Sequence, residues 1–580
     1  MRGRKLSLVE LPAYSRVVVG SNPTAPTKII NQQCVIVDLF FFMGVCRCRR
    51  DCRPSWAVAV DFYRKVKMLK RILFVFFFFY SSCLAQFSSS KVYNYPLYLN
   101  PCLPSVEDLN CDGNLDYVVS GLIGLFGPAF KFYDGVNPAN VISGPIISIS
   151  TSYGLTQFAD VNLDGFTDII QPIYDPNVSI PSNIAVYYGL GNGHFSSQIM
   201  SPAPALFSFC HAKRIDYDLD GISDFVFGGS YVPNAAPVAF SGKWNNSTQQ
   251  MSFLNYTSQM TSGNPSPSQV VGVPRKVTID AVGYKWLVFG TNVFQFRLVE
   301  ATQALNNPII INSTYNINSY DVYDFDFDGN DDIIYCSEPG MCEIIYLDQY
   351  KSVISRNIIN LGSGGTVSLR GLAVEDIGNN AAPQVCILDA YLNPAVLIIT
   401  DFITVTNYTL SNQSNATSNA IRVEKSELKN GRNCFIISLF ASSYNSEKLE
   451  FTNPGAYPSS TFVGSEPTLG WINRDPSIGD LEMSFVMSNG YSGMPAIVSF
   501  GSVLNNPPVA LTPYFNLYNN LLFYSSATVV NSNGCAAVNW GIPWNPSLYG
   551  IHLACQWITS DLSSNAIGSN GIDLYLGYSY

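Results

Sequence analysis

The 580-residue sequence has little charge and very little histidine: charged residues make up 13% of it, and histidine occurs three times. None of the three, His194, His211 and His552, stands at a spacing from Cys, Asp, Glu or a nucleophile that suits metal catalysis or a triad. Walker, H-E-x-x-H and G-x-S-x-G motifs are also missing. We therefore expect no catalytic residues and a protein that is not an enzyme.

Basic residues are in the minority, with 32 Lys and Arg against 42 Asp and Glu and a formal net charge of −10. Binding to a phosphate backbone requires clustered Lys and Arg that displace counterions. This charge balance therefore excludes nucleic acid as an expected partner. After Tyr80 the sequence also lacks an unbroken apolar run of about 18 residues, so we expect no transmembrane span in the mature chain.

Aromatic, glycine and proline residues are abundant: aromatics make up 13%, and there are 43 Gly and 34 Pro. Gly, Pro, Asn and Ser recur at short intervals, which is typical of many short strands joined by turns. Long amphipathic patterns are scarce. The composition thus favours an all-β protein with a large repeat fold or several domains.

The N-terminal region differs from the rest. Residues 1–67 are rich in Lys and Arg, and residues 16–27 look like a translated transfer-RNA gene end, so we interpret 1–67 as a misannotated or non-structural extension. The alternative is a zinc site at Cys46, Cys48 and Cys52, but a fourth ligand at suitable spacing is missing. Residues 68–85 have the charge, apolar run and small-residue end of a secretory signal peptide. We therefore expect a secreted or cell-surface protein.

Export would place nine cysteines in an oxidising environment. Three close pairs are candidates for local disulfides, and the sequence leaves the pairing open. Cys83 could instead carry a lipid if the segment is a lipoprotein signal. The candidate pairs are Cys102/Cys111, Cys336/Cys342 and Cys535/Cys555.

Four segments of the chain share the pattern D-x-[DN]-x-D-G-x-x-D and then enter an apolar run that predicts a strand. Their conserved spacing brings four side-chain oxygens into each loop. The residues at the first, third, fifth and ninth positions are Asp108, Asn110, Asp112 and Asp116; Asp160, Asn162, Asp164 and Asp168; Asp216, Asp218, Asp220 and Asp224; and Asp324, Asp326, Asp328 and Asp332.

This spacing suits calcium, which takes six to eight hard oxygen ligands. Alternate residues of a tight loop can direct carboxylates at one centre, and Gly at the sixth position permits the sharp turn. An Asp at the ninth position and flanking strands distinguish the pattern from an EF-hand. A turn in which Asp and Asn side chains hydrogen-bond their own backbone is the alternative for any single copy. Four copies in register favour Ca²⁺ as the cofactor.

The loops recur at a nearly constant interval. Those that begin at Asp108, Asp160 and Asp216 lie 52 and 56 residues apart, and the 108 residues from Asp216 to Asp324 leave room for a degenerate unit near Asp280. A period of about 50 to 60 residues with four short strands per unit is the size of a propeller blade.

Further degenerate units begin at Glu375, Lys429 and Asn473. They have lost too many carboxylates to predict metal sites, but they extend the array. The sequence therefore predicts an all-β fold: a β-propeller of seven or eight four-stranded blades with calcium loops, plus a small C-terminal β-rich segment.

The loops and two turns resemble the FG-GAP/VCBS repeats, the blade type of integrin alpha-subunit propellers and many bacterial surface proteins. Phe126-Gly127-Pro128 is similar to the FG turn, and residues 184–195 are similar to the strand that ends in a G-x-G-x-F turn. The resemblance covers roughly Tyr93 to Asn505. It implies calcium between two strands of a blade, side-chain ligands at the four positions above and a backbone oxygen at the seventh. It also implies seven blades, whereas the spacing gives eight units.

These patterns divide the chain into an extension at 1–67, a signal peptide at 68–85, a propeller at 86–505, and a C-terminal β-rich segment or final blade at 506–580. We expect a calcium-binding repeat protein that binds a surface protein or a glycan, as in cell adhesion. The alternative is a carbohydrate-active enzyme, a glycosidase or polysaccharide lyase, because paired carboxylates could be hidden among the acidic residues.

Overall fold

The computed structural model describes parts of the second of two units into which contacts divide the chain, Met1–Cys83 and Leu84–Tyr580. The interpretations of 1–67 and 68–85 lie outside these residues. The described ranges are 88–90, 94–95, 105–110, 116–122, 128–133, 141–142, 156–173, 183–204, 209–218, 220–230, 237–263, 270–278, 285–301, 307–337, 340–361, 369–375, 383–389, 396–400, 405–409, 422–425, 432–439, 444–452, 459–463, 469–473, 476, 478–502, 504–512, 515–519 and 524–577.

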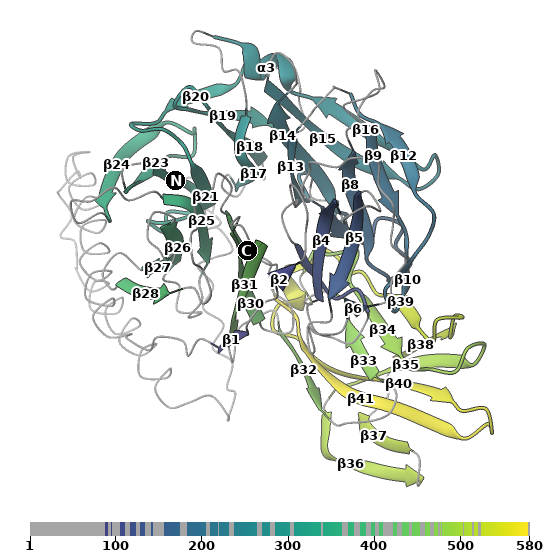
Figure 1. Ribbon diagram of the computed structural model, residues 1–580. Helices are drawn as coiled ribbons and strands as arrows, with labels where there is room; N and C mark the ends of the chain where they lie inside the picture. Colours follow the sequence, from purple (N-terminus) through teal and green to yellow (C-terminus); the bar gives the residue numbers. More distant parts are fainter. Residues whose placement is uncertain are drawn as a thin grey trace, which may run out of the picture. The chain divides into compact units, whose positions relative to one another are not determined.

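Antiparallel strands dominate these residues, which confirms the all-β expectation (Figure 1). The three sheets nearest the N-terminus carry the first three Asp-rich loops. Their strands are β3 (Ser105–Glu107), β4 (Asp116–Leu122), β5 (Pro128–Tyr133) and β6 (Val141–Ile142); β7 (Gln157–Ala159), β8 (Asp168–Ile173), β9 (Asn183–Tyr187) and β12 (Ile199–Pro202); and β13 (Phe209–Ile215), β14 (Asp224–Ser230), β15 (Pro237–Asn245) and β16 (Gln250–Asn255).

Three further four-stranded sheets follow, of which the middle one carries the fourth loop. Their strands are β17 (Val270–Thr278), β18 (Lys285–Thr291), β19 (Gln295–Glu300) and β20 (Ile309–Asn312); β21 (Ser319–Tyr323), β22 (Asp332–Ser337), β23 (Met341–Leu347) and β24 (Val353–Asn360); and β25 (Leu369–Glu375), β26 (Gln384–Asp389), β27 (Val396–Thr400) and β28 (Val405–Thr409). A short hairpin of β10 (Gly189–Gly191) and β11 (His194–Phe195) and the helix α3 (Thr257–Thr261) lie between strands.

The next sheet combines the two ends of this array. Its strands β29 (Arg422–Lys425), β30 (Arg432–Leu439) and β31 (Tyr444–Thr452) come late in the chain, but β31 also pairs with β1 (Ser88–Ser90) and β2 (Asn94–Tyr95). Two segments more than 300 residues apart in sequence therefore share one sheet.

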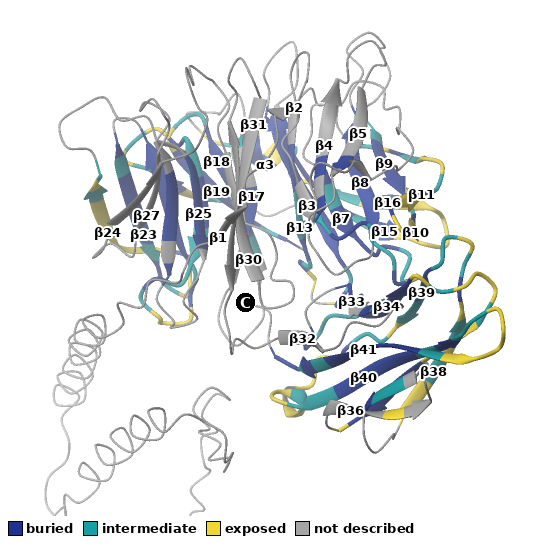
Figure 2. Ribbon diagram, turned by 60° about the horizontal axis from the view of Figure 1, so that its bottom comes forward, coloured by how far each residue is buried: buried dark blue, intermediate teal, exposed yellow. Residues whose placement is uncertain are grey.

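Successive sheets meet through their first strands: β7 contacts β13, β13 contacts β17, β17 contacts β21, β21 contacts β25, and β25 contacts β29. The strands next to these contacts are buried on both faces. All residues of β8 and β22 are buried, whereas β24, the outer strand of its sheet, is almost wholly exposed (Figure 2). This arrangement of stacked four-stranded sheets is like that of a β-propeller, and it explains why the inner strands read as continuous apolar runs.

Three of the degenerate units lie between the first and second strands of a sheet, as the intact loops do. The one near Asp280 lies between β17 and β18, the one at Glu375 between β25 and β26, and the one at Lys429 between β29 and β30. The unit at Asn473 differs, because it joins strands of a different set of sheets.

That last set comprises residues 459–577, and we call it the C-terminal β unit. The predicted boundary near 505 lies within its paired strands, since β35 pairs with β40 and β34 with β39. Its five-stranded sheet is β32 (Ser459–Val463), β41 (Ala566–Tyr575), β40 (His552–Ser560), β35 (Pro495–Gly501) and β38 (Tyr524–Val529). Its three-stranded sheet is β33 (Leu469–Ile472), β34 (Ser484–Ser488) and β39 (Ala536–Asn539), and its two-stranded sheet is β36 (Leu504–Thr512) with β37 (Phe515–Asn519). A 3₁₀ turn spans Pro546–Leu548.

The structure bears on two expectations from the sequence, the candidate disulfide pairs and the lack of a transmembrane span. Cys336 and Cys342 face each other across β22 and β23, and both are buried thiols, as are Cys535 and Cys555. Cys102 and Cys111 lie outside the described residues. Within the described ranges, none of the helices has the length and apolarity required to cross a membrane.

A buried ion pair connects three sheets. Arg275 Nε on β17 lies 2.7 Å from Asp321 Oδ1 on β21, and their side chains are 8% and 2% exposed. The other oxygen, Asp321 Oδ2, accepts a hydrogen bond of 2.9 Å from the Val374 amide on β25. Because a buried charge is costly once its partner is removed, this link fixes the spacing of neighbouring sheets.

We expect Asp321→Asn to lower the free energy of unfolding by about 3 kcal/mol, because it removes the carboxylate charge that faces the buried Arg275 guanidinium. Asp348→Asn makes the same chemical change in an exposed turn and should alter stability by less than about 0.5 kcal/mol. Urea unfolding of both variants measures the difference. Equal effects would show that the ion pair does not hold the sheets.

Candidate metal centres in the repeat loops

Each Asp-rich loop joins the first and second strands of a four-stranded sheet: 108–116 lies between β3 and β4, 160–168 between β7 and β8, 216–224 between β13 and β14, and 324–332 between β21 and β22. The first strand ends and the second begins at neighbouring points of the same sheet edge. The loop must therefore reverse direction within a few residues.

One hydrogen bond recurs in all four loops. The ninth-position carboxylate accepts the amide of the second residue. The bonds are Leu109 N to Asp116 Oδ2 at 2.9 Å, Val161 N to Asp168 Oδ2 at 2.9 Å, Tyr217 N to Asp224 Oδ2 at 3.4 Å and Phe325 N to Asp332 Oδ2 at 3.0 Å. All four aspartates are 0% exposed.

The sixth-position glycine closes the turn as expected. Gly165, Gly221 and Gly329 have φ values of +91°, +82° and +89°, a left-handed conformation that favours glycine. Their amides donate to the first-position aspartates, with distances of 2.7, 3.2 and 2.9 Å. The turn is thus fixed by side chain to backbone bonds before any ion is considered.

In two of the loops three carboxylates converge. One oxygen from each of Asp216, Asp218 and Asp224 lies within 4.8 Å of the others, and Asp324, Asp326 and Asp332 form the same arrangement. Carboxylate oxygens that close together repel one another unless a cation lies between them. Hard oxygen ligands at this separation suit a divalent cation such as calcium.

Among the described residues, the first two loops do not form such a cluster of three carboxylates. Asp160 and Asp168 are buried, but the amide of Asn162 donates to Asp164, and its own carbonyl oxygen accepts the Asp164 backbone amide. In loop 108–116 the structure describes Asp108, Asn110 and Asp116, of which the two aspartates are buried. Asp112 lies outside the described residues.

Loop 216–224 contains a buried oxygen whose hydrogen-bonding capacity is not used. Asp168 Oδ1 accepts the Gly189 amide at 2.8 Å, and Asp332 Oδ1 accepts the Leu347 amide at 2.9 Å. Asp224 Oδ1 is buried and has no hydrogen-bond partner among the described residues. An orphaned buried acceptor costs about 1 to 3 kcal/mol, so this atom indicates a missing cation or donor.

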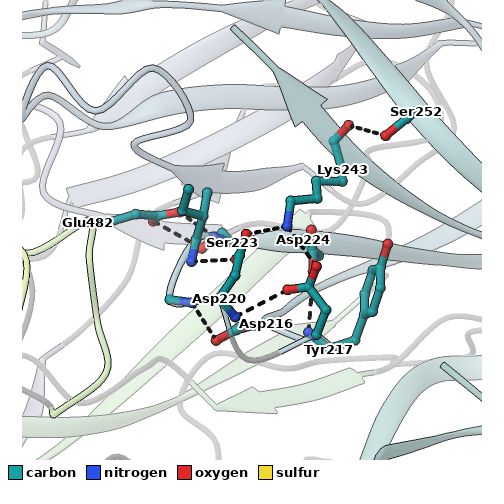
Figure 3. A network of polar contacts seen from close by, with 11 residues as sticks. Asp216, Tyr217, Asp220, Ser223, Asp224, Lys243, Ser252 and Glu482 are labelled. Carbon is teal, nitrogen blue, oxygen red and sulfur yellow. Dashed lines mark hydrogen bonds and ion pairs between the residues drawn. The ribbon is translucent and has the colours of Figure 1, made fainter. Parts of the chain in front are cut away.

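A lysine also distinguishes this loop. Lys243 Nζ lies 2.7 Å from Asp218 Oδ2. It also contacts the Asp220 carboxylate (Figure 3). On β15, Lys243 faces Asp224 in the strand register. Tyr188 and Tyr346 stand at the corresponding register positions of loops 160–168 and 324–332. The sequence analysis missed Lys243, although aligning the strands after each loop would have revealed it.

The carboxylates titrate abnormally because they are buried together. Burial and the neighbouring Asp218, Asp220 and Asp216 raise the pKa of Asp224 to about 8. Burial, with Asp326 and Asp324, likewise raises the pKa of Asp332 to about 8. Asp218 differs: burial acts to raise its pKa, but the Lys243 ammonium lowers it below its usual value. Without a metal, the Asp224 and Asp332 carboxyl groups therefore keep their protons to a higher pH than an ordinary aspartate does.

Comparison with known proteins names no family for this arrangement. No protein-family model and no curated protein matches the chain. One similar solved structure is described as "Crystal structure of BBS1N in complex with ARL6DN, soaked with lead", with 9% identity, a TM-score of 0.41, and coverage of 63% of this chain and 98% of that chain. A computationally designed Ika8 protein is 10% identical with a TM-score of 0.34, covering 60% and 83%. Likeness at this level adds nothing to the sheet pattern described above.

We expect the metal-free protein to lose stability as the pH rises from about 4 to about 8. Unfolded carboxyl groups titrate near pH 4, whereas Asp224 and Asp332 titrate at about 8 when folded. The folded state therefore holds extra protons in this window, and the free energy of unfolding falls as they are lost. Urea unfolding between pH 5 and pH 8 after removal of metal measures the slope.

The variant Asp332→Asn provides the control, because it removes one of the groups whose pKa is raised and should reduce the slope. The pKa of Asp324, which burial raises to about 6, and that of Asp168, which burial also raises, add to the same trend. Stability that is flat or rises with pH would contradict the expected titration.

Proposed function

We propose that this protein is a secreted or cell-surface, calcium-stabilised β-propeller that acts as a binding or adhesion module for a protein or glycan. The convergence of Asp324, Asp326 and Asp332, repeated at Asp216, Asp218 and Asp224, is the observation that carries the calcium part of the proposal. In each loop the three oxygens lie within 4.8 Å of one another, which one divalent ion can satisfy. Secretion rests on the signal-like segment at 68–85.

We propose seven blades of the FG-GAP/VCBS type. Six four-stranded sheets support six blades, and the sheet of β29, β30 and β31 supports a seventh whose outer strand is β1. An N-terminal strand paired with the last blade would tie the ends of the array together. The eighth unit counted in the sequence, at Asn473, belongs to the C-terminal β unit instead.

We propose a binding role and not a catalytic one because the aspartates of the four loops interact with the backbone and with one another. The loop aspartates accept backbone amides and face one another, so their chemistry is directed at the fold. Stacked rigid sheets offer a broad face for contact, as in other repeat arrays. The loop ions then have a structural role, and the ligand is bound by surfaces that they hold in place.

We expect calcium to raise the melting temperature, because it binds the folded loops and not the unfolded chain. At about 100-fold excess over Kd, one site contributes about 2.7 kcal/mol. Asp332→Asn should remove the increase due to loop 324–332, whereas Asp348→Asn, outside the loops, should not. Calorimetry with calcium and with chelator measures both.

The two converging loops should fill at different calcium concentrations. In loop 216–224 calcium must displace the Lys243 ammonium, so this loop should bind more weakly than loop 324–332. Lys243→Tyr, which copies the residue at the equivalent positions, should reduce the difference. A melting curve unaffected by calcium in every variant would contradict the metal assignment.

We expect residues 86–580 to bind a glycan or a surface protein without turning over any polysaccharide. Screening on glycan and cell-surface protein arrays, followed by a reducing-sugar assay on every glycan bound, tests both parts. Polysaccharide cleavage that is abolished by changing one acid outside the four loops would instead establish a carbohydrate-active enzyme.

A further inference from the structure

The C-terminal β unit contacts the loop 216–224 directly. The Leu481 amide donates to the Gly221 carbonyl at 2.9 Å. Beside it, Glu482 accepts two hydrogen bonds from Ser223: one from the backbone amide and one from Ser223 Oγ at 3.0 Å (Figure 3). Leu481 and Glu482 thus bind two of the nine residues of the third Asp-rich loop, Gly221 and Ser223.

Glu482 brings a further carboxylate to an acidic loop. Its side chain is 0% exposed, and Ser223 is 5% exposed, so water does not screen this contact. The loop already contains four aspartates, of which Asp224 is fully buried. Burying another negative charge beside them is unfavourable unless positive charge lies nearby. Lys243 supplies one such charge while the loop is free of metal, and a divalent cation that displaces it and meets the unpartnered Asp224 Oδ1 would supply two.

The backbones approach each other so closely at this contact that glycine is required. A Cβ atom on Gly221 would lie 2.4 Å from the Gly479 carbonyl oxygen and 2.7 Å from Leu481 Cγ. The conformation of the loop and the position of the C-terminal β unit are therefore coupled, because a small shift of Gly221 produces either a clash or a gap.

The second Asp-rich loop is covered by the same unit. Phe166 packs against buried Val486 and Cys535, and a Cβ on Gly165 would lie 2.5 Å from Ala537 Cβ. The adjoining hairpin is bound too, since the side-chain amides of Asn531 and Asn533 donate to the Leu190 carbonyl at 3.0 and 2.9 Å.

The fourth loop lacks this cover. A Cβ on Gly329 would meet no heavy atom of the described residues within 4 Å, and Phe327 and Asp328 are exposed. Loops 216–224 and 324–332 thus share a carboxylate arrangement, but within the described part of the chain the C-terminal β unit contacts the first of them and not the second.

We propose that a divalent cation in loop 216–224 controls the docking of the C-terminal β unit. The inference rests on the proposed calcium binding. With the ion bound, its two positive charges offset part of the negative charge of the four aspartates, and the loop holds the Ser223 amide and hydroxyl in place for Glu482. Without it, the carboxylates repel one another, the loop shifts, and the contacts of Leu481 and Glu482 open. The C-terminal β unit is then attached in a calcium-dependent way.

Hydrogen exchange of the full-length protein tests this proposal. Exchange in peptides covering residues 478–486 and 531–541 should become at least about tenfold faster when calcium is replaced by chelator, because contacts at a docking surface open more readily than the global fold. Peptides from the middle of β40, which is buried within its own unit, should change little.

Variants separate the docking loop from the others. Asp224→Asn should reproduce the faster exchange in the presence of calcium. Asp332→Asn, the same substitution at the same position of the uncovered loop, should leave residues 478–486 unchanged. Glu482→Gln removes the charge that accepts both Ser223 bonds and should speed exchange at 220–223 and 478–486, while the number of calcium ions bound, measured by titration calorimetry, stays the same.

The outcomes distinguish the two proposals. Calcium binding seen by calorimetry, together with unchanged exchange at 478–486 on chelation, would overturn the docking proposal and leave the calcium proposal standing. Equal effects of Asp224→Asn and Asp332→Asn at 478–486 would also overturn it, because the coupling would then be global. The absence of any calcium binding would overturn both proposals.

Discussion

The ninth-position aspartate of each loop is the residue on which the other features of the repeat depend. It is fully buried at the start of the second strand, and it accepts the amide that begins the loop. One side chain thereby fixes the end of one strand, the start of the next and the loop between them. Its burial also creates the need for a counter-charge, since an isolated buried carboxylate is very unfavourable. The carboxylates at the first and third positions increase that need, and they make the loop suitable for a cation.

The loops meet this need in different ways, although their sequences are nearly the same. In loop 216–224 a lysine from the third strand contacts two of the carboxylates, whereas loops 160–168 and 324–332 have tyrosine at that position. The ninth aspartate also differs, because Asp168 and Asp332 accept a second amide and Asp224 does not. Some chemical differences between equivalent loops thus arise from the strand that packs over them.

Buried polar links also connect the sheets. Asp321 receives Arg275 from one neighbour and the Val374 amide from the other. Within one sheet, the buried Glu343 carboxylate accepts Arg356, Thr314 and Tyr335. Since each buried polar group has specific partners, these contacts specify how the sheets stack more sharply than apolar packing alone. A rigid stack of this kind is the support that a binding surface requires.

Features that depend on neighbouring residues could be predicted from the sequence. The D-x-[DN]-x-D-G-x-x-D spacing was enough to predict the sharp turn at glycines such as Gly165 and the strands that follow, because these arise within nine residues. Apolar runs such as those of β8 and β22 predicted buried strands for the same reason.

Features that join distant segments could not be predicted from the sequence and are seen in the folded chain. The pairing of β31 with β1, the Lys243 contact, and the assignment of residues 459–501 to the C-terminal β unit depend on residues far apart in the chain. Glu482 shows the reason most clearly. Nothing around it in the sequence marks it, and its role comes entirely from Ser223, 259 residues away, whose amide and hydroxyl it meets in a buried contact.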